Sequence, residues 1–303
     1  MIYIGIYCIG GYSQGRCFMK FKSKRMKVTF IVFLVTILLS IFFTYQNNAV
    51  SITEYNYVNE KIPKGFDGYK IMQVSDLHNK DYYGRLSKKI EKVSPDIIII
   101  TGDLIDRRNT RIDIAIEFIK EIVDIAPIYY VSGNHEQLSG NYDELKKELE
   151  KANVQIIDNS YIELNKDLDK IGLMGIADPA INQSEGEYLF ESSSEYVKNS
   201  ITDLYKNIDT DFNILLSHRP EQFSIYKEMN VDLVFSGHAH GGQIRLPLIG
   251  GIVAPNQGLF PEYTEGVYKE GPTSMVVSRG LGNSIFPFRV FNRPELVMVT
   301  LEK

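Results

Sequence analysis

From residue 69 onward, short apolar runs alternate with segments that have the periodicity of amphipathic helices. Residues 97–101 read IIIIT, and an unbroken β-branched run is typical of a strand that is buried on both faces. Residues 69–75 and 128–131 are predicted to form the strands before and after it in the chain. A helix is predicted between each pair of consecutive strands, and Pro95 and Pro127 are predicted to end these two helices. This alternation predicts parallel strands covered by helices.

The second half of the chain is predicted to be richer in strands. Short strands are expected around Ile156 and Ile162 and over residues 171–176, 212–217, 233–236, 244–246, 273–278 and 296–301, and residues 182–195 form a polar stretch expected to be a surface loop. Two groups of strands with accompanying helices predict an α/β (α+β) fold, a four-layer αββα sandwich of two mixed sheets flanked by helices.

Charge is distributed unevenly along the chain. The first 53 residues contain six basic residues and no acidic one, so the remainder carries a net charge of −11 within a total of −5. An acidic body argues against broad binding to a nucleic-acid backbone, and no stable nucleic-acid partner is expected. Both cysteines, Cys8 and Cys17, precede Lys20, which excludes a disulfide framework or a thiolate metal site in the remainder.

One apolar segment stands apart from the globular body. It begins at Val28, ends at Tyr45 and contains about 18 residues without a charge, close to the length that crosses a bilayer. Basic residues precede it, which predicts a single-pass anchor with a cytoplasmic N-terminus and an extracytoplasmic globular body. A cleaved signal peptide would have a similar composition, and Met19 and Met26 are alternative starts.

The predicted organisation has four parts. Residues 1–27 are expected to form a basic cytoplasmic N-terminus, residues 28–45 the transmembrane anchor, residues 46–68 a tether, and residues 69–303 the globular domain, which contains the motifs described next.

Five short motifs lie at the ends of predicted strands, where ligands gather in open α/β sheets. They are D-L-H at 76–78, G-D-L-I-D at 102–106, G-N-H-E at 133–136, a single histidine at 218, and G-H-A-H at 237–240, and together they contain all five histidines of the chain. Nitrogen and oxygen ligands without thiolate suit Mn, Fe, Co or Zn. Two such cations about 3.5–4 Å apart can activate water and neutralise phosphoryl charge, so the motifs predict a two-metal site that hydrolyses phosphoesters.

The motifs and their order resemble those of the calcineurin-like metallophosphoesterases over about residues 69–302. With its predicted anchor, the chain is most similar to the membrane-associated bacterial branch that includes UDP-2,3-diacylglucosamine hydrolase-like members. The resemblance implies a phosphodiesterase or pyrophosphatase of the bacterial cell membrane that uses two divalent metal ions and a metal-bridging hydroxide.

The resemblance also implies a role for each motif residue. One metal ion would be held by Asp76, His78, Asp103 and His240. The second would share Asp103 and be completed by Asn134, His218 and His238. His135 would protonate the leaving oxygen or stabilise the transition state, with Asp106 orienting its ring. Arg219 and Gln243 are candidates for substrate binding.

Three questions stay open at the level of sequence. The family often has Arg-Gly where this chain has Arg107-Arg108, so the role of Arg107 is undefined. A membrane-tethered metal-binding or sensory module on the same fold, without turnover, is the alternative function. The predicted anchor favours a lipid-linked phosphoester as substrate, and a set of aromatic residues could either form an apolar rim at the site or pack in the core: Phe260, Tyr263, Phe286 and Phe288.

Overall fold

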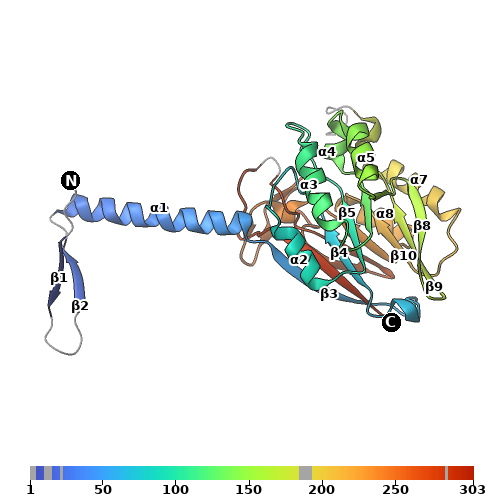
Figure 1. Ribbon diagram of the computed structural model, residues 1–303, viewed down its shortest axis with the longest axis horizontal. Helices are drawn as coiled ribbons and strands as arrows, with labels where there is room; N and C mark the ends of the chain where they lie inside the picture. Colours follow the sequence, from blue (N-terminus) through green and yellow to red (C-terminus); the bar gives the residue numbers. More distant parts are fainter. Residues whose placement is uncertain (1–4, 10–15, 21–22, 184–192, 284–285) are drawn as a thin grey trace. The chain divides into compact units, whose positions relative to one another are not determined.

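The computed structural model describes residues 5–9, 16–20, 23–183, 193–283 and 286–303, and the chain divides into two compact units, residues 1–45 and 46–303 (Figure 1). Most of the predicted loop at 182–195 lies outside the described residues.

The first unit contains a hairpin and most of one long helix. Strands β1 (Gly5–Ile9) and β2 (Arg16–Lys20) pair antiparallel, in a region where the sequence shows no strand periodicity. Helix α1 (Lys24–Asn48) contains the predicted apolar segment and extends beyond both of its ends. It is long and apolar enough to cross a membrane, a test that a signal sequence would also pass.

The first sheet of the second unit has six strands in the order β3-β18-β4-β5-β6-β7. They are β3 (Ser51–Val58), β18 (Glu295–Glu302), β4 (Lys70–Val74), β5 (Ile97–Thr101), β6 (Ile128–Val131) and β7 (Gln155–Ile156). Strands β4 to β7 are parallel, whereas β18 runs antiparallel to β4 and parallel to β3. The sheet is therefore mixed.

The second sheet has the order β16-β17-β11-β10-β9-β8. Its strands are β16 (Gly266–Glu270), β17 (Thr273–Val277), β11 (Leu233–Ser236), β10 (Asn213–Leu216), β9 (Asp169–Gly175) and β8 (Ser160–Lys166). The four central strands are parallel, and the two edge strands, β16 and β8, pair antiparallel with their neighbours.

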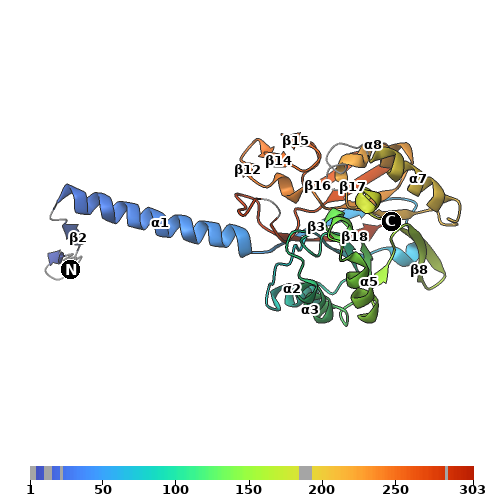
Figure 2. The same ribbon diagram turned by 90° about the horizontal axis from the view of Figure 1, so that it is seen from above.

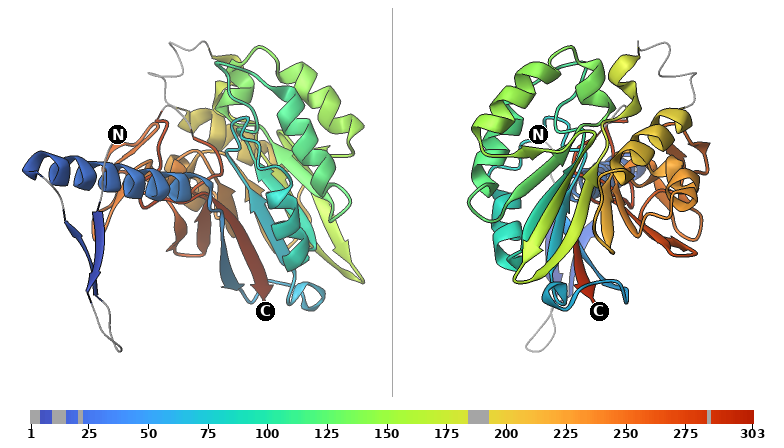
Figure 3. Two further views of the ribbon diagram at one scale, coloured as in Figure 1. Left: turned by 60° about the vertical axis from the view of Figure 1, so that its left-hand side comes forward. Right: turned by 90° about the vertical axis from the view of Figure 1, so that its right-hand side faces the viewer.

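Helices cover the outer face of each sheet, as Figures 2 and 3 show. Helices α2 (Arg85–Val93), α3 (Ile112–Ile122) and α5 (Tyr142–Lys151) pack on the first sheet, and α7 (Ser194–Tyr205) and α8 (Phe223–Glu228) pack on the second. Along β5, Ile98 and Ile100 face the helices while Ile97 and Ile99 face the other sheet. This period of two produces the layers, and the predicted αββα arrangement is confirmed.

Short elements complete the second unit. They are the 3-10 helices η1 (Lys64–Phe66), η2 (Pro179–Asn182), η3 (Pro220–Gln222) and η4 (His240–Gly242), helix α4 (Asn134–Leu138), and the strand pairs β12 (Arg245–Leu246) with β13 (Gly250–Gly251) and β14 (Val253–Ala254) with β15 (Gly258–Leu259).

The predicted tether at 46–68 is the main difference from expectation. This region contains β3, whose eight residues pair in register with β18, and Tyr57 is buried between the two sheets. Because its partner strand lies more than 200 residues away in the chain, the local pattern gives no sign of the pairing. The compact second unit accordingly begins at Gln46 rather than at residue 69.

Candidate metal centre

The five motifs meet at one edge of the two sheets. Parallel strands β4, β5 and β6 of the first sheet and β10 and β11 of the second each lead directly into one motif. Seven buried side chains converge there: Asp76, His78, Asp103, Asn134, His218, His238 and His240. All seven are the residues for which the sequence predicts metal binding.

The backbone at these positions is unusual. Asp76, His78, Asp103, His238 and His240 all have positive φ, between 46° and 64°. Each such conformation costs on the order of 1–3 kcal/mol for a residue other than glycine, and persists only where the surrounding structure enforces it. The rigid sheets therefore hold strained turns that direct five polar side chains inward.

Glycines permit the close approach of these turns. A Cβ atom on Gly133 would lie 2.3 Å from Asp103 Oδ1, and one on Gly237 would lie 2.0 Å from Ser75 Oγ. Neither contact is sterically allowed, so a larger residue at either position would displace a neighbouring turn.

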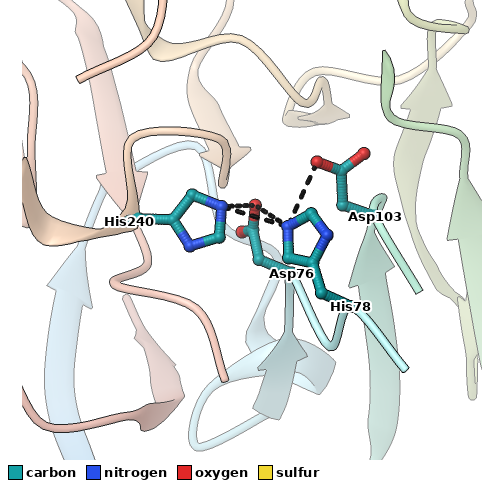
Figure 4. Close-up of side chains that lie close together, drawn as sticks. All are labelled: Asp76, His78, Asp103 and His240. Atoms are coloured by element: carbon teal, nitrogen blue, oxygen red, sulfur yellow. Dashed lines mark hydrogen bonds and ion pairs between the residues drawn. The ribbon is translucent and has the colours of Figure 1, made fainter. Parts of the chain in front are cut away.

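The first ligand cluster is shown in Figure 4. His78 Nε2 lies 3.0 Å from His240 Nε2, and Asp76 Oδ1 lies 3.3 Å from His240 Nε2. Asp103 Oδ2 lies 3.5 Å from His78 Nε2. Ligand atoms that bind one ion at roughly 2.0–2.2 Å are about 3 Å apart, so the spacing of these four side chains fits a divalent cation.

The second cluster shares one atom with the first. Asp103 Oδ2 also lies 3.2 Å from His218 Nε2, which lies 3.1 Å from His238 Nδ1. The buried Asn134 Oδ1 has no hydrogen-bond partner among the described residues, as expected of an oxygen that is available to a cation. One carboxylate oxygen of Asp103 thus belongs to both clusters.

Two hydrogen bonds fix which ring nitrogens are available. His218 Nδ1 lies 2.6 Å from the Thr101 carbonyl oxygen, so it donates and leaves the Nε2 lone pair free for a metal. His238 Nε2 lies 2.9 Å from Asn256 Oδ1, an amide oxygen that can only accept, so Nε2 donates and Nδ1 carries the lone pair. Such outer partners orient ligating histidines in metal sites. Sequence reasoning missed Asn256, because no local pattern links it to His238.

The electrostatics of the centre call for positive charge. Burial by itself would raise the pKa of Asp103, but His218, His135 and His78 together outweigh burial and hold that pKa well below its usual range. Burial by itself would lower the pKa of His218, but Asp103, Asp76 and Asp178 together outweigh burial and raise this pKa to about 10. A metal ion bound at His218 would therefore displace the proton from Nε2. Nearby positive charge thus favours the ionised form of two buried carboxylates, Asp76 and Asp103, and a divalent metal would supply such charge.

His135 is held differently from the expectation. Its Nδ1 accepts a hydrogen bond of 3.1 Å from the backbone N–H of Arg107, whereas Asp106 Oδ2 lies 3.9 Å from that nitrogen, beyond hydrogen-bonding distance. Asp106 Oδ1 instead accepts from the backbone N–H of Arg108 at 2.8 Å. The predicted orienting bond from Asp106 is therefore replaced by a backbone donor, and a neutral His135 carries its hydrogen on Nε2. Burial lowers the pKa of His135 to about 4, which favours this neutral form.

Glu136 is a site residue whose role sequence reasoning missed, although it lies in a quoted motif. Its buried carboxylate accepts hydrogen bonds from the backbone N–H groups of Asp103 and Gly133, both at 2.8 Å, and of Ile105 at 3.2 Å. The side chain thereby ties the turn after β5 to the turn after β6.

A pocket of about 490 Å³ opens over the centre. Asp103, Asn134, His135, His238 and His240 are among the residues that line it, and its walls include Arg107, Arg108, Gln243, Phe286 and residues 253–256. The predicted substrate candidate Gln243 is thus present at the pocket.

Arg219, the other substrate candidate, lies elsewhere. Its buried guanidinium makes two hydrogen bonds of 2.7 Å to the Asp178 carboxylate. Arg219 is not among the described residues that line the pocket, and its guanidinium is directed to Asp178 instead.

Comparison with known proteins agrees with this geometry. The calcineurin-like phosphoesterase family model matches residues 69–242, more than half of the chain. The "Uncharacterized metallophosphoesterase YkuE" of Bacillus subtilis is 31% identical over 265 residues, covering 85% of this chain and 87% of that protein. The "Phosphodiesterase YaeI" of Escherichia coli is 24% identical over 247 residues, covering 77% of this chain and 82% of that protein.

A vertebrate relative has a membrane-related name. The "Transmembrane protein with metallophosphoesterase domain" of Danio rerio is 24% identical over 260 residues, covering 80% of this chain and 55% of that protein. From the family match and the clustered aspartate and histidine side chains, the chain belongs to the calcineurin-like phosphoesterases and is a metal-dependent phosphoester hydrolase.

Proposed function

We propose that this protein is a membrane-anchored phosphodiesterase or pyrophosphatase that uses two divalent metal ions, with Mn, Fe, Co or Zn suited to its ligands. The observation that carries the proposal is the shared oxygen of Asp103, which lies 3.5 Å from His78 Nε2 in one cluster and 3.2 Å from His218 Nε2 in the other. Asp76 and His240 would complete the first site, and Asn134, His218 and His238 the second.

The protein's own groups would bind and orient the phosphoester. Bound ions of this kind lower the pKa of water and neutralise phosphoryl charge. Neutral Asn134 adds a ligand oxygen without reducing the positive charge that a phosphoryl group meets. His135 lines the pocket, and its Nε2–H can donate to the leaving oxygen or to a phosphoryl oxygen.

Turnover is favoured over a purely metal-binding or sensory role by His135. The side chain is buried against the first cluster, with its ring 4.4 Å from that of His78, and its tautomer is fixed by Arg107 N–H. Metal binding alone would not require a second imidazole held in this way.

The test is hydrolysis of bis-p-nitrophenyl phosphate by the full chain in detergent, assayed with each candidate metal. Asp103→Ala should reduce both bound metal and activity. His135→Ala should reduce the rate by about 10²–10⁴-fold, the range that general acid–base catalysis contributes, with metal content unchanged. A folded, metal-loaded protein without activity would favour the sensory alternative.

The membrane assignment depends on α1. Its apolar length, the basic residues before it and the name of the Danio rerio relative support a single-pass anchor in the bacterial cell membrane, with the catalytic unit on the extracytoplasmic side. Protease added to intact cells should then degrade the catalytic unit. Protection of that unit until lysis would contradict this topology.

We further propose a lipid-linked phosphoester as the substrate, as in the UDP-2,3-diacylglucosamine hydrolase-like branch. An anchored enzyme meets such molecules at high local concentration. Lipid and nucleotide-lipid extracts of deletion and wild-type cells should differ in one phosphoester pool. Identical pools would remove the support for a lipid-linked substrate.

A further inference from the structure

We infer that two loops beside the metal pocket form a surface that contacts the lipid bilayer and sets the pocket mouth at the headgroup level. This inference rests on the proposed anchoring by α1. The surface, called the apolar face below, consists of Leu248, Ile249, Leu259, Phe260, Phe286 and Phe288.

The side chains of the apolar face are exposed rather than packed in a core. Leu248 is 109% exposed, Phe260 67% and Phe288 52%. Tyr263, in contrast, packs edge-on against Phe223 and Tyr268. Soluble monomers rarely expose large contiguous apolar patches, and a patch beside a ligand pocket usually marks an interaction site.

The two loops are joined at their bases although they are separate in the chain. Ile244 and Val290 form a parallel bridge, with the Arg245 N–H donating to the Val290 carbonyl at 3.0 Å. Asn292 Nδ2 adds a hydrogen bond of 2.9 Å to the Gln243 carbonyl. The hairpin strands β12, β14 and β15 gather at one corner of the second unit (Figure 2).

The backbone of the loops is strained in a way that core packing does not explain. Leu248 and Phe260 have φ of 70° and 54°, a left-handed conformation that is unfavourable for residues with a side chain. In water, an exposed apolar side chain makes no contact that would offset the cost of this backbone conformation. In contact with lipid, the transfer of each exposed apolar side chain out of water would be favourable.

Charge also favours lipid over other occupants. Residues 246–261 contain no charged side chain, although the chain after residue 53 carries −11. The neighbouring Arg245 is paired with Glu265, and Arg289 is buried. An acidic protein is repelled by anionic headgroups, so an uncharged face is the part that can approach them.

The first residues of the second unit are hydrogen-bonded to one of the two loops. Within the second unit, Asn47 Oδ1 accepts hydrogen bonds from Arg289 N–H at 3.0 Å and from Asn283 Nδ2 at 3.2 Å, and Lys80 Nζ donates to the Asn47 carbonyl. The uncharged segment ends at Tyr45, two residues before Asn47. The chain thus leaves the catalytic unit toward the proposed anchor at the loop that carries Phe286 and Phe288.

The apolar face continues into the pocket. Phe286 and residues 253–256 line the same cavity as the metal ligands. A phosphoester with an apolar tail could therefore present its headgroup to the centre while the tail stays in lipid.

The absence of tryptophan from the sequence makes the test direct. Single-tryptophan variants Phe260→Trp and Phe288→Trp of the full chain are reconstituted into vesicles of phosphatidylcholine and phosphatidylglycerol, with or without dibromo-phosphatidylcholine as quencher. Phe33→Trp in α1 reports on anchoring. Leu168→Trp is the matched control, because Leu168 is 102% exposed in the turn just before β9, at the opposite end of that strand from the ligands.

The tryptophan emission of Phe260→Trp and Phe288→Trp should be blue-shifted and largely quenched by the brominated lipid, and that of Leu168→Trp should not. Quenching of Phe33→Trp alone would overturn the apolar face and leave the anchor intact. A blue shift at the loops without quenching would mean that protein, such as a second copy, covers them, and would also overturn it. If no variant were quenched, the anchor would fail as well, while hydrolysis of the soluble diester would still report on the proposed chemistry.

Discussion

At the scale of single residues, Glu136 offers a sharp test of how the centre is organised. The carboxylate accepts three backbone N–H bonds, and in Glu136→Gln an amide NH₂ would face at least one of these donors. Metal affinity should fall by about 10–100-fold, the usual effect of losing an outer partner of a metal site. Isothermal titration with Mn²⁺ measures this, with Glu144→Gln in the exposed first turn of α5 as control. Equal affinities in both variants would contradict a positioning role.

The sequence predicted which residues belong to the site far better than it predicted which groups these residues contact. The seven predicted ligands lie together because each motif follows a buried strand, and parallel strands place their ends at one edge. The partner of His135 could not be read in this way. That partner is a backbone N–H, and the pattern of side chains in a sequence does not indicate which backbone group donates a hydrogen bond to a histidine ring. Arg219 likewise looked available next to His218, but Asp178, 41 residues away, pairs with it.

At the scale of elements, β3 is one of the strands that local patterns did not reveal. Tyr57 is buried between the sheets, and its hydroxyl donates to the Asp232 carbonyl at 3.0 Å. Tyr57→Ala should lower the free energy of unfolding by about 3–5 kcal/mol, as for other large aromatic residues in cores. Val58→Ala, one residue along and 58% exposed, is the control. Denaturant unfolding measures the free energy of unfolding of both variants. If residues 51–58 were a loose tether, neither substitution would lower that free energy.

Helices and strands whose apolar residues recur with a clear helical or strand periodicity were predicted well. Residues 128–131 were predicted as a strand and form β6, and the helix stop at Pro95 agrees with the end of α2 at Val93. The hairpin β1–β2 and strand β3 were not predicted, because pairing between strands depends on a partner and not on the periodicity of one segment.

At the scale of the whole molecule, removal of metal should destabilise the second unit. Asp76 and Asp103 are buried and ionised, so a bound cation stabilises the folded state over the unfolded one. At metal concentrations of about 100 times Kd, binding raises the free energy of unfolding by about 2.7 kcal/mol. A chelator should therefore lower the melting temperature of the wild type, and added Mn²⁺ should restore it. In Asp103→Asn the two conditions should give closely similar melting curves, and a full shift in that variant would argue against binding at this centre.

The order β3-β18-β4 has a consequence for biogenesis. The strand between β3 and β4 follows every other named strand along the chain, so the first sheet stays open until the ribosome has synthesised residues 295–302. If α1 enters the membrane as it emerges, the rest of the chain follows through the translocation channel before this sheet can close. The catalytic unit would then fold only after export, and its strained ligand turns would first be assembled outside the cell, where the metal supply is that of the surroundings rather than of the cytoplasm.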